Sequence, residues 1–129
     1  MKVIVCGAGQ VGQGIAQHLA GEGIDVIVVD RAAALMQRIS DTLDVRPIQG
    51  HGAYPETLEK AGAADADILI AVTASDEVNM VTCQVAKSLF KVPKTIARVR
   101  DGHYLTGKWQ HSLFNRENIP VDVIISPET

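Results

Sequence analysis

Gly7-Ala8-Gly9-Gln10-Val11-Gly12 is the stretch of sequence that decides the fold. It matches the pattern G-x-G-x-x-G, in which the first glycine allows a tight turn, the second leaves room for a pyrophosphate and the third lets a helix approach a sheet closely. A β-branched run, Lys2–Cys6, precedes it, and Val11, Ile15 and Leu19 then recur at helical spacing. This context predicts a dinucleotide-binding unit, whereas a glycine-rich turn that binds nothing is the alternative.

Strand-like and helix-like segments alternate along the rest of the chain. The first helix should stop at Gly21. On the helix expected over 76–90, one face carries Val78, Val81, Val85 and Leu89. Gly107 interrupts the pattern of the last expected helix. The expected strands are 2–6, 25–30, 45–49, 68–72, 95–100 and 121–126, and the helices after the first are 32–43, 55–61, 76–90 and 103–114.

Six strands with helical crossovers predict an α/β fold, a Rossmann-type doubly wound parallel sheet with strand order 3-2-1-4-5-6. Pro47 fits this order, because the third strand is then an edge strand and can lack one hydrogen-bond donor. The chain of 129 residues is the size of one domain, 1–129.

Composition excludes several classes of protein. A net charge of −3 gives no electrostatic case for binding nucleic acid. No apolar run is long enough to span a membrane, so a cytoplasmic protein is expected. In a reducing compartment Cys6 and Cys83 should be buried thiols instead of a disulfide. The four histidines have no metal-ligand spacing with either cysteine.

Asp30 ends the second expected strand, near the spacing of about 20 residues at which the dinucleotide fold places a carboxylate on the adenosine ribose. A carboxylate there repels a 2′-phosphate and favours NAD over NADP, although Arg31 could accommodate such a phosphate. The alternative is that Asp30 only caps the next helix. Because ATP, ADP and AMP share this ribose, the motif indicates an adenine nucleotide more firmly than NAD.

The fourth strand should lie beside the first, so the residues after it should line the same crevice as the glycine loop. Thr73 and Ala74 are therefore candidate ligand contacts. Helix capping by Thr73 or Ser75 is an equally good explanation of this segment.

Two arginines, Arg98 and Arg100, lie on the fifth expected strand. A mostly buried strand rarely carries an unpaired charge, so at least one of them should have an anionic partner. That partner is a phosphate, or Asp76 or Glu77, and the pattern does not choose between the two arginines.

These residues together resemble the RCK, or KTN, nucleotide-binding domain of TrkA-type regulators of potassium uptake. The segment after the fourth strand is the most distinctive part of the resemblance. It rests on Gly7–Gly12, Val29-Asp30, Gln49-Gly50-His51-Gly52, Ala71–Met80 and Ala97-Arg98-Val99-Arg100.

The resemblance implies a regulatory subunit, cytoplasmic and peripheral at the inner face of the membrane, that gates a potassium-translocating membrane subunit. It implies a homo-oligomer, a dimer or tetramer of RCK domains, that binds NAD(H) in competition with ATP or ADP. Relatives that prefer ATP often carry arginine in place of Gln10, so this chain favours NAD. The expected contacts, with Gly12 and Arg31 added from the pattern itself, are Gly7, Ala8, Gly9, Gln10, Val11, Gly12, Asp30, Arg31, Thr73, Ala74 and Arg98.

Members of this family usually continue past the sixth strand into a crossover helix and a second, smaller domain. This chain ends at Thr129. We therefore expect residues 1–129 to be the N-terminal unit without the C-terminal ligand domain, either an isolated domain or a piece of a longer protein.

A hydride-transfer enzyme is the main alternative function. Tyr104 and Lys108 match Y-x-x-x-K, in which the lysine lowers the pKa of a proton-transferring tyrosine. No serine ends the fifth strand, Ala8 stands where the corresponding glycine pattern needs glycine, and the chain has no room for a substrate domain. The sequence therefore predicts a nucleotide sensor without catalytic residues.

Overall fold

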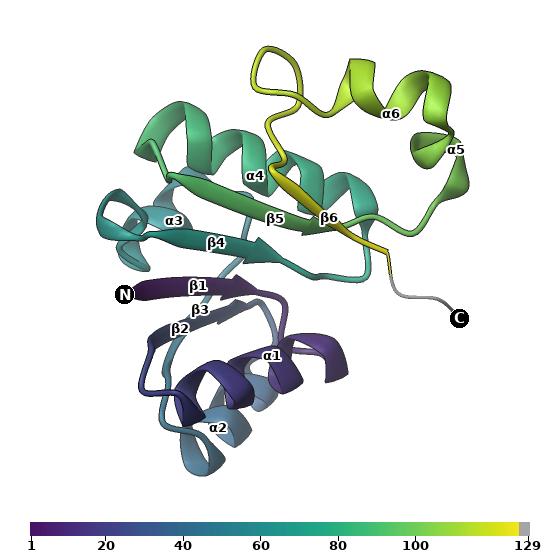
Figure 1. Cartoon of the computed structure of the whole chain (residues 1–129). Coiled ribbons are helices and arrows are strands. Elements are labelled where there is room, and N and C mark those ends of the chain that lie inside the picture. Colours follow the sequence, from purple (N-terminus) through teal and green to yellow (C-terminus); the bar gives the residue numbers. More distant parts are fainter. Residues whose placement is uncertain (127–129) are drawn as a thin grey trace.

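The computed structural model describes residues 1–126 and contains one six-stranded parallel sheet (Figure 1). The strand order is β3-β2-β1-β4-β5-β6, which confirms the predicted Rossmann-type topology. Residues 127–129 of the expected domain lie outside the described part of the chain. The strands are β1 (Lys2–Cys6), β2 (Asp25–Asp30), β3 (Arg46–Gln49), β4 (Ile68–Ala71), β5 (Lys94–Arg98) and β6 (Val123–Ile125).

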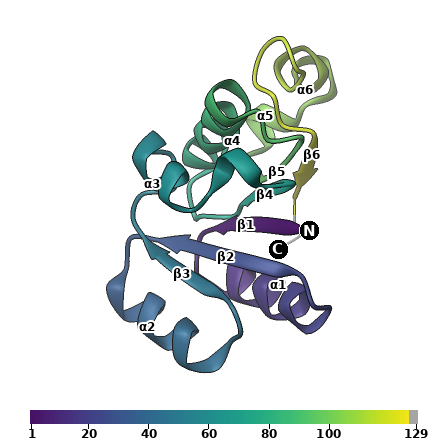
Figure 2. The ribbon, with the colours of Figure 1, turned by 90° about the vertical axis from the view of Figure 1, so that its left-hand side faces the viewer.

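Helices cover both faces of the sheet (Figures 1 and 2). Helices α1 (Gln10–Gly21) and α2 (Ala33–Thr42) pack on one face, over the side chains of Val3 and Val5. Helices α3 (Pro55–Lys60) and α4 (Asp76–Phe90), with the 3₁₀ turn η1 (Ala63–Asp65), pack on the other, over Ile4 and Cys6. Alternate residues of one strand thus enter two separate cores, which explains why the central strands are apolar throughout.

The carboxyl end of β5 differs from the prediction, since the strand ends at Arg98 and not at Arg100. The backbone N–H groups of Arg100 and Asp101 donate to the carboxylate of Asp76, at 3.0 and 2.8 Å, instead of to a neighbouring strand. At the opposite edge of the sheet, Pro47 lies on β3, as its missing N–H requires.

The single helix expected over 103–114 is wrong. Two short helices, α5 (Gly102–Leu105) and α6 (Gly107–Leu113), are separated by Thr106, whose backbone is extended (φ −66°, ψ 133°). Neither helix contains a fully buried residue, and only Tyr104 and Leu105 of α5 pack partly against the core, so packing does little to hold the two in one continuous helix. None of the helices within residues 1–126 combines the length and the apolar character that crossing a membrane requires.

The predicted apolar stripe on α4 does not face the sheet as a whole. Val81 and Leu89 are 50% and 57% exposed, and Val85 is only partly buried, while the sheet-facing side carries Met80 and the small or polar residues Asn79, Cys83 and Ala86. Small side chains let the helix lie close to the sheet, and Val81 and Leu89 remain on its outer side. Both cysteines are free and buried, as predicted.

The glycine loop joins β1 to α1 by a very close approach of backbone to backbone. Gly7 has φ +117°, and a Cβ there would lie 2.9 Å from the backbone of Val72 and Thr73. A Cβ on Gly12 would overlap the carbonyl oxygen of Gly7. These two glycines therefore bring the amino end of α1 to the carboxyl ends of β1 and β4.

We expect Gly12→Ala to lower the free energy of unfolding by about 3 kcal/mol or more, because the added methyl group meets rigid backbone. Gly14→Ala is the matched control: no heavy atom of the described residues lies within 4 Å of a Cβ there, so alanine should stabilise the helix by about 0.5–1 kcal/mol. Chemical denaturation of both variants measures the two effects. Equal stabilities would show that the close approach is not needed.

Candidate functional site

Two hollows meet at the carboxyl ends of β1, β2 and β4. The first has a volume of about 270 Å³ and the second about 380 Å³. Gly7, Asp30, Thr73 and Ala74 line both of them. The crevice therefore opens at the switch point of the sheet, where this topology places ligands.

Asp30 lies between the two hollows and holds the glycine loop. One oxygen, Oδ2, accepts a hydrogen bond from the backbone N–H of Ala8, and Oδ1 accepts one from the N–H of Ala32, each at 2.8 Å. Helix α2 has Ala32 as its N-cap and no side-chain cap, so Asp30 does not cap that helix in the usual sense. Each carboxylate oxygen keeps a second acceptor site for a ligand hydroxyl.

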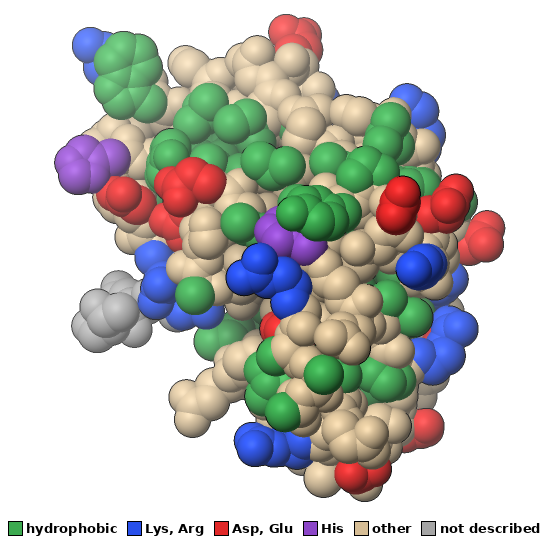
Figure 3. Space-filling view, turned by 180° about the vertical axis from the view of Figure 1, so that it is seen from behind, with side chains coloured by type: hydrophobic (Ala, Val, Ile, Leu, Met, Phe, Trp, Pro, Cys, Tyr) green, Lys and Arg blue, Asp and Glu red, His purple; other side chains and the backbone are tan. Residues whose placement is uncertain are grey.

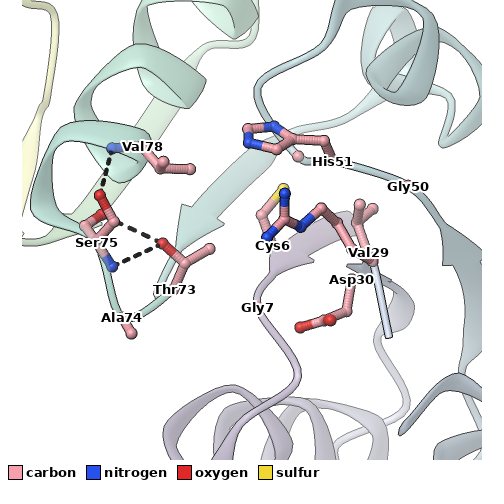
Figure 4. Close-up of a pocket in the computed structure, with 12 residues that line it drawn as sticks. Cys6, Gly7, Val29, Asp30, Gly50, His51, Thr73, Ala74, Ser75 and Val78 are labelled. Atoms are coloured by element: carbon pink, nitrogen blue, oxygen red, sulfur yellow. Dashed lines mark hydrogen bonds between the residues drawn. The ribbon is translucent and has the colours of Figure 1, made fainter. Parts of the chain in front are cut away.

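The first hollow has two walls and an aromatic rim (Figure 4). Thr73, Ser75 and Val78 line one wall, Val29 and Asp30 line the other, and His51 lies across its upper side. The ring of His51 stacks on Tyr54 at 4.3 Å, and its Nδ1 accepts from the N–H of Ala53 at 3.1 Å. A neutral ring bound in this way carries its proton on Nε2.

The sequence-based site did not include His51, although it includes Arg31, which also lines this hollow. A signal for His51 was present. It follows the carboxyl end of β3 just as Asp30 ends β2, and neighbouring parallel strands end at the same edge of the sheet.

The second hollow lies over the start of α1. Gly7–Val11 line it together with Leu35 and Val72, which the sequence-based site did not include. No heavy atom of the described residues lies within 4 Å of a Cβ built on Gly9, so the fold itself does not need glycine there. Gly9 is the N-cap of α1 without a side-chain cap, which leaves N–H groups of the first turn facing the hollow.

Arg98 and Arg100, which the sequence did not distinguish, have different surroundings. Arg98 lines the second hollow, and its Nε is buried without a hydrogen-bond partner among residues 1–126. Arg100 is exposed, and its guanidinium donates to the carbonyl oxygen of Ala74 at 3.3 Å. Neither guanidinium forms an ion pair with Asp76 or Glu77 in the described part of the chain. A buried, unpartnered donor at Arg98 favours an anionic ligand beside it.

For the turn after β4 the sequence left open whether Thr73 and Ser75 contact a ligand or cap the next helix. Ser75 is the cap of α4 and accepts from the N–H of Val78 at 3.2 Å. The hydroxyl of Thr73 donates to Asn79 Oδ1 at 2.7 Å and accepts from the N–H of Ser75. Thr73 thus shapes the turn and lines both hollows without capping the helix.

The structure gives no support to a catalytic tyrosine. Tyr104 lies on α5 and Lys108 on α6, with the break at Thr106 between them, and the ammonium of Lys108 lies over the ring of Trp109. A hydrogen bond to Glu77 raises the pKa of Tyr104, the opposite of what proton transfer needs. Burial likewise raises the pKa of the Cys6 thiol in the first hollow, so it is a poor nucleophile.

Comparison with known proteins decides the family. A model of the TrkA-N domain matches residues 3–127. The chain belongs to the TrkA-N domain family. This TrkA-N domain is 54% identical over 128 residues to the Trk system potassium uptake protein TrkA of Azorhizobium caulinodans and 53% identical to that of Halomonas elongata. In both alignments 99% of the chain matches, but it spans only 28% and 27% of the relatives' length.

Solved structures share the fold at low sequence identity. The TrkA-N domain of the inner membrane protein ybaL from Escherichia coli has a TM-score of 0.82 at 16% identity, over 97% of this chain and 86% of that one. The GsuK channel bound to NAD has a TM-score of 0.77 at 16% identity, over 96% and 21%. The Kef C-terminal domain of Shewanella denitrificans in its AMP-bound form has a TM-score of 0.69 at 24% identity, over 81% and 65%.

The family assignment also decides between the two classes of function. The relatives that match 99% of this chain are potassium uptake proteins by name, and the matching family is that of the TrkA-N domain, which is not a family of hydride-transfer enzymes. The family assignment and the positions of Tyr104 and Lys108 both speak against the hydride-transfer alternative.

We expect Gly9→Val to abolish NADH binding while it changes the free energy of unfolding by less than about 1 kcal/mol, because the backbone there is extended and space is open. Gly14→Val, on the outer side of α1, is the control and should bind normally. Isothermal titration with each folded variant makes the measurement. Normal binding by Gly9→Val would place the ligand elsewhere.

Proposed function

We propose that this domain is the NAD(H)-binding sensor of a TrkA-type regulatory subunit, with ATP or ADP as competing ligands. The whole protein would be cytoplasmic, peripheral at the inner face of the membrane, and would gate a potassium-translocating membrane subunit. Residues 1–129 would be its N-terminal nucleotide unit. One observation carries the proposal: Asp30 lies between two hollows, and Arg98, which lines the second, has a buried Nε without a partner among the described residues.

The first hollow is suited to adenosine. Free acceptor sites on Asp30 match a ribose diol, and the stacked rings of His51 and Tyr54 give a flat apolar edge beside it. Val29 and Val78 add apolar surface. Such a hollow would accept the part that NAD, ATP, ADP and AMP have in common.

The second hollow is suited to phosphates. Open space above Gly9, the uncapped amino end of α1 and the guanidinium of Arg98 surround it. Gln10 carries no charge, so this part of the site offers one arginine and the helix end to the phosphates. That modest positive charge favours a dinucleotide diphosphate over a triphosphate.

We expect the wild-type domain to bind NADH and ADP, and NADPH more weakly because Asp30 repels a 2′-phosphate. Asp30→Asn should cost about 1–3 kcal/mol of NADH affinity, since a neutral amide replaces a charge-assisted acceptor. Calorimetry on folded protein makes both measurements.

The matched control is Asp25→Asn at the other end of β2, where the carboxylate pairs only with the exposed Arg46 at 3.3 Å. It should leave affinity unchanged. If Asp30→Asn binds NADH as the wild type does, Asp30 serves only to hold Ala8 and Ala32. If no adenine nucleotide binds to the wild type, the sensor proposal is wrong.

The outward face of α4 is the proposed contact between copies of this domain. Seen from behind, apolar side chains gather over the upper half of the molecule, where α3 and α4 lie (Figure 3). On α4 the exposed apolar side chains are Val81 and Leu89, and Val85 between them is partly buried against the core. An apolar row of this kind is typical of a helix that packs against a partner.

A second copy fits this face by its charges as well as by its shape. If two α4 helices pack antiparallel about Val85, Val81 meets Leu89 of the second copy, and the pairing repeats by symmetry. Glu77 at the acidic start of one helix then lies near Lys91 at the basic end of the other. The two helix dipoles also oppose each other.

We expect Leu89→Glu to weaken self-association about a hundredfold or more, because a symmetric contact would bury two carboxylates against apolar surface. Gln17→Glu, exposed on α1, adds the same charge on the other face of the sheet and is the control. Sedimentation velocity over a range of concentrations measures the effect. A wild-type chain that stays monomeric, or a Leu89→Glu variant that associates normally, contradicts the contact.

Helix α4 would also connect the nucleotide site with this contact. It begins at Ser75, in the wall of the first hollow, and carries the apolar row on its outer face. Nucleotides that share adenosine but differ beyond it could favour different positions of α4, which is the requirement for a population shift. A coupling of about 1–3 kcal/mol is enough for regulation of this kind.

A further inference from the structure

Asn79 is a fully buried polar side chain that contacts the ends of two strands at once. Its amide nitrogen donates to the carbonyl oxygens of Thr73, at 3.1 Å, and Arg98, at 2.8 Å. Its oxygen accepts from the N–H of Thr73 at 2.9 Å and from the Thr73 hydroxyl at 2.7 Å. Every donor and both acceptor sites of the amide are therefore used.

The neighbouring buried residue Thr82 shows that burial on α4 does not require such a network. Thr82 is also fully buried, yet its hydroxyl donates only to the carbonyl oxygen of Val78, one turn earlier in the same helix. Asn79 instead links α4 to residues 6 and 19 positions away in the chain. A buried amide that joins three elements fixes their relative positions, because each bond would cost free energy if it were left unmade.

We propose that Asn79 is a positioning residue that sets the distance between Thr73 and Arg98 and so determines affinity for the part of the nucleotide beyond adenosine 5′-monophosphate. This inference rests on the proposed nucleotide-binding function. Arg98 is held through its backbone oxygen, while its side chain lines the second hollow and its buried Nε has no hydrogen-bond partner among the described residues. Loss of Asn79 leaves that backbone held only on the side of β6, where Arg98 pairs with Ile125, so the guanidinium is less precisely placed.

The same amide gives α4 a mechanical connection to the ligand. A ligand that displaces Arg98 or Thr73 also displaces Asn79, which lies in the first turn of α4. The outer face of the same helix carries the proposed contact between copies. At the adenosine end Thr73, Ser75 and Val78 only line the wall, and the polar group there, Asp30 on β2, bonds to Ala8 and Ala32 and not to Asn79. NADH and AMP should therefore depend on Asn79 to different degrees.

The test compares Asn79→Ala with Thr82→Ala, two fully buried polar residues of the same helix cut to the same size. Calorimetry gives the dissociation constants of each variant for NADH and for AMP. We expect Asn79→Ala to weaken NADH about tenfold or more, roughly the effect of one lost buried hydrogen bond, and AMP less than about twofold. Thr82→Ala should leave the ratio of the two constants unchanged.

The ratio is informative because a general loss of stability lowers affinity for both ligands alike. An unchanged ratio in Asn79→Ala, or an equal change in Thr82→Ala, would overturn the inference and leave Asn79 a structural residue. A wild-type domain that binds neither NADH nor AMP would refute the proposed function itself, and this inference with it.

A measurement on the wild-type chain decides the question even if Asn79→Ala does not fold. The chain has three asparagines, and the side-chain amide of Asn79 is the buried one, so its NMR signals should exchange slowly with solvent. Saturation with NADH should shift these signals, whereas saturation with AMP should not. Equal shifts with both ligands, or none with NADH, would overturn the inference.

Discussion

The contact between Gly7 and Gly12 is the constraint on which the other features depend. No side chain fits at either position, because backbone meets backbone on both sides of the loop. The contact places the amino end of α1 directly over the carboxyl ends of β1 and β4. Without this contact the glycine loop would not line the second hollow. The free N–H groups of α1 would then face solvent and not the proposed binding site.

A second layer of bonds holds the walls of the crevice around that loop. Asp30 ties β2 to Ala8 in the loop, and Asn79 ties β4 and β5 to α4. Both are polar groups at the ends of parallel strands, where the sheet no longer supplies partners for backbone N–H and C=O groups. The residues that complete the fold at this edge are thus the same ones that shape the proposed nucleotide site.

Helix α4 takes part in both the proposed nucleotide site and the proposed contact between copies. The inner face of α4 combines Met80 with the small or polar residues Asn79, Cys83 and Ala86, which allows a close fit to the sheet, and its outer face exposes Val81 and Leu89. In most surface helices the large apolar residues face inward. The two exposed residues are therefore available to the proposed partner, while Asn79 lies at the wall of the proposed nucleotide site.

Sequence alone was sufficient for the topology, since glycine spacing, strand length and Pro47 depend on local sterics and hydrogen bonding. It also located Asp30 and the glycine loop, because their spacing follows from the length of one βα unit. Local pattern could not tell which face of α4 meets the sheet, whether Gly107 would break the last helix, or which arginine lines the crevice. Those choices depend on packing between distant segments: Arg98 differs from Arg100 because of where β4, α4 and the glycine loop lie around it, and His51 enters the site only because β3 ends beside β2.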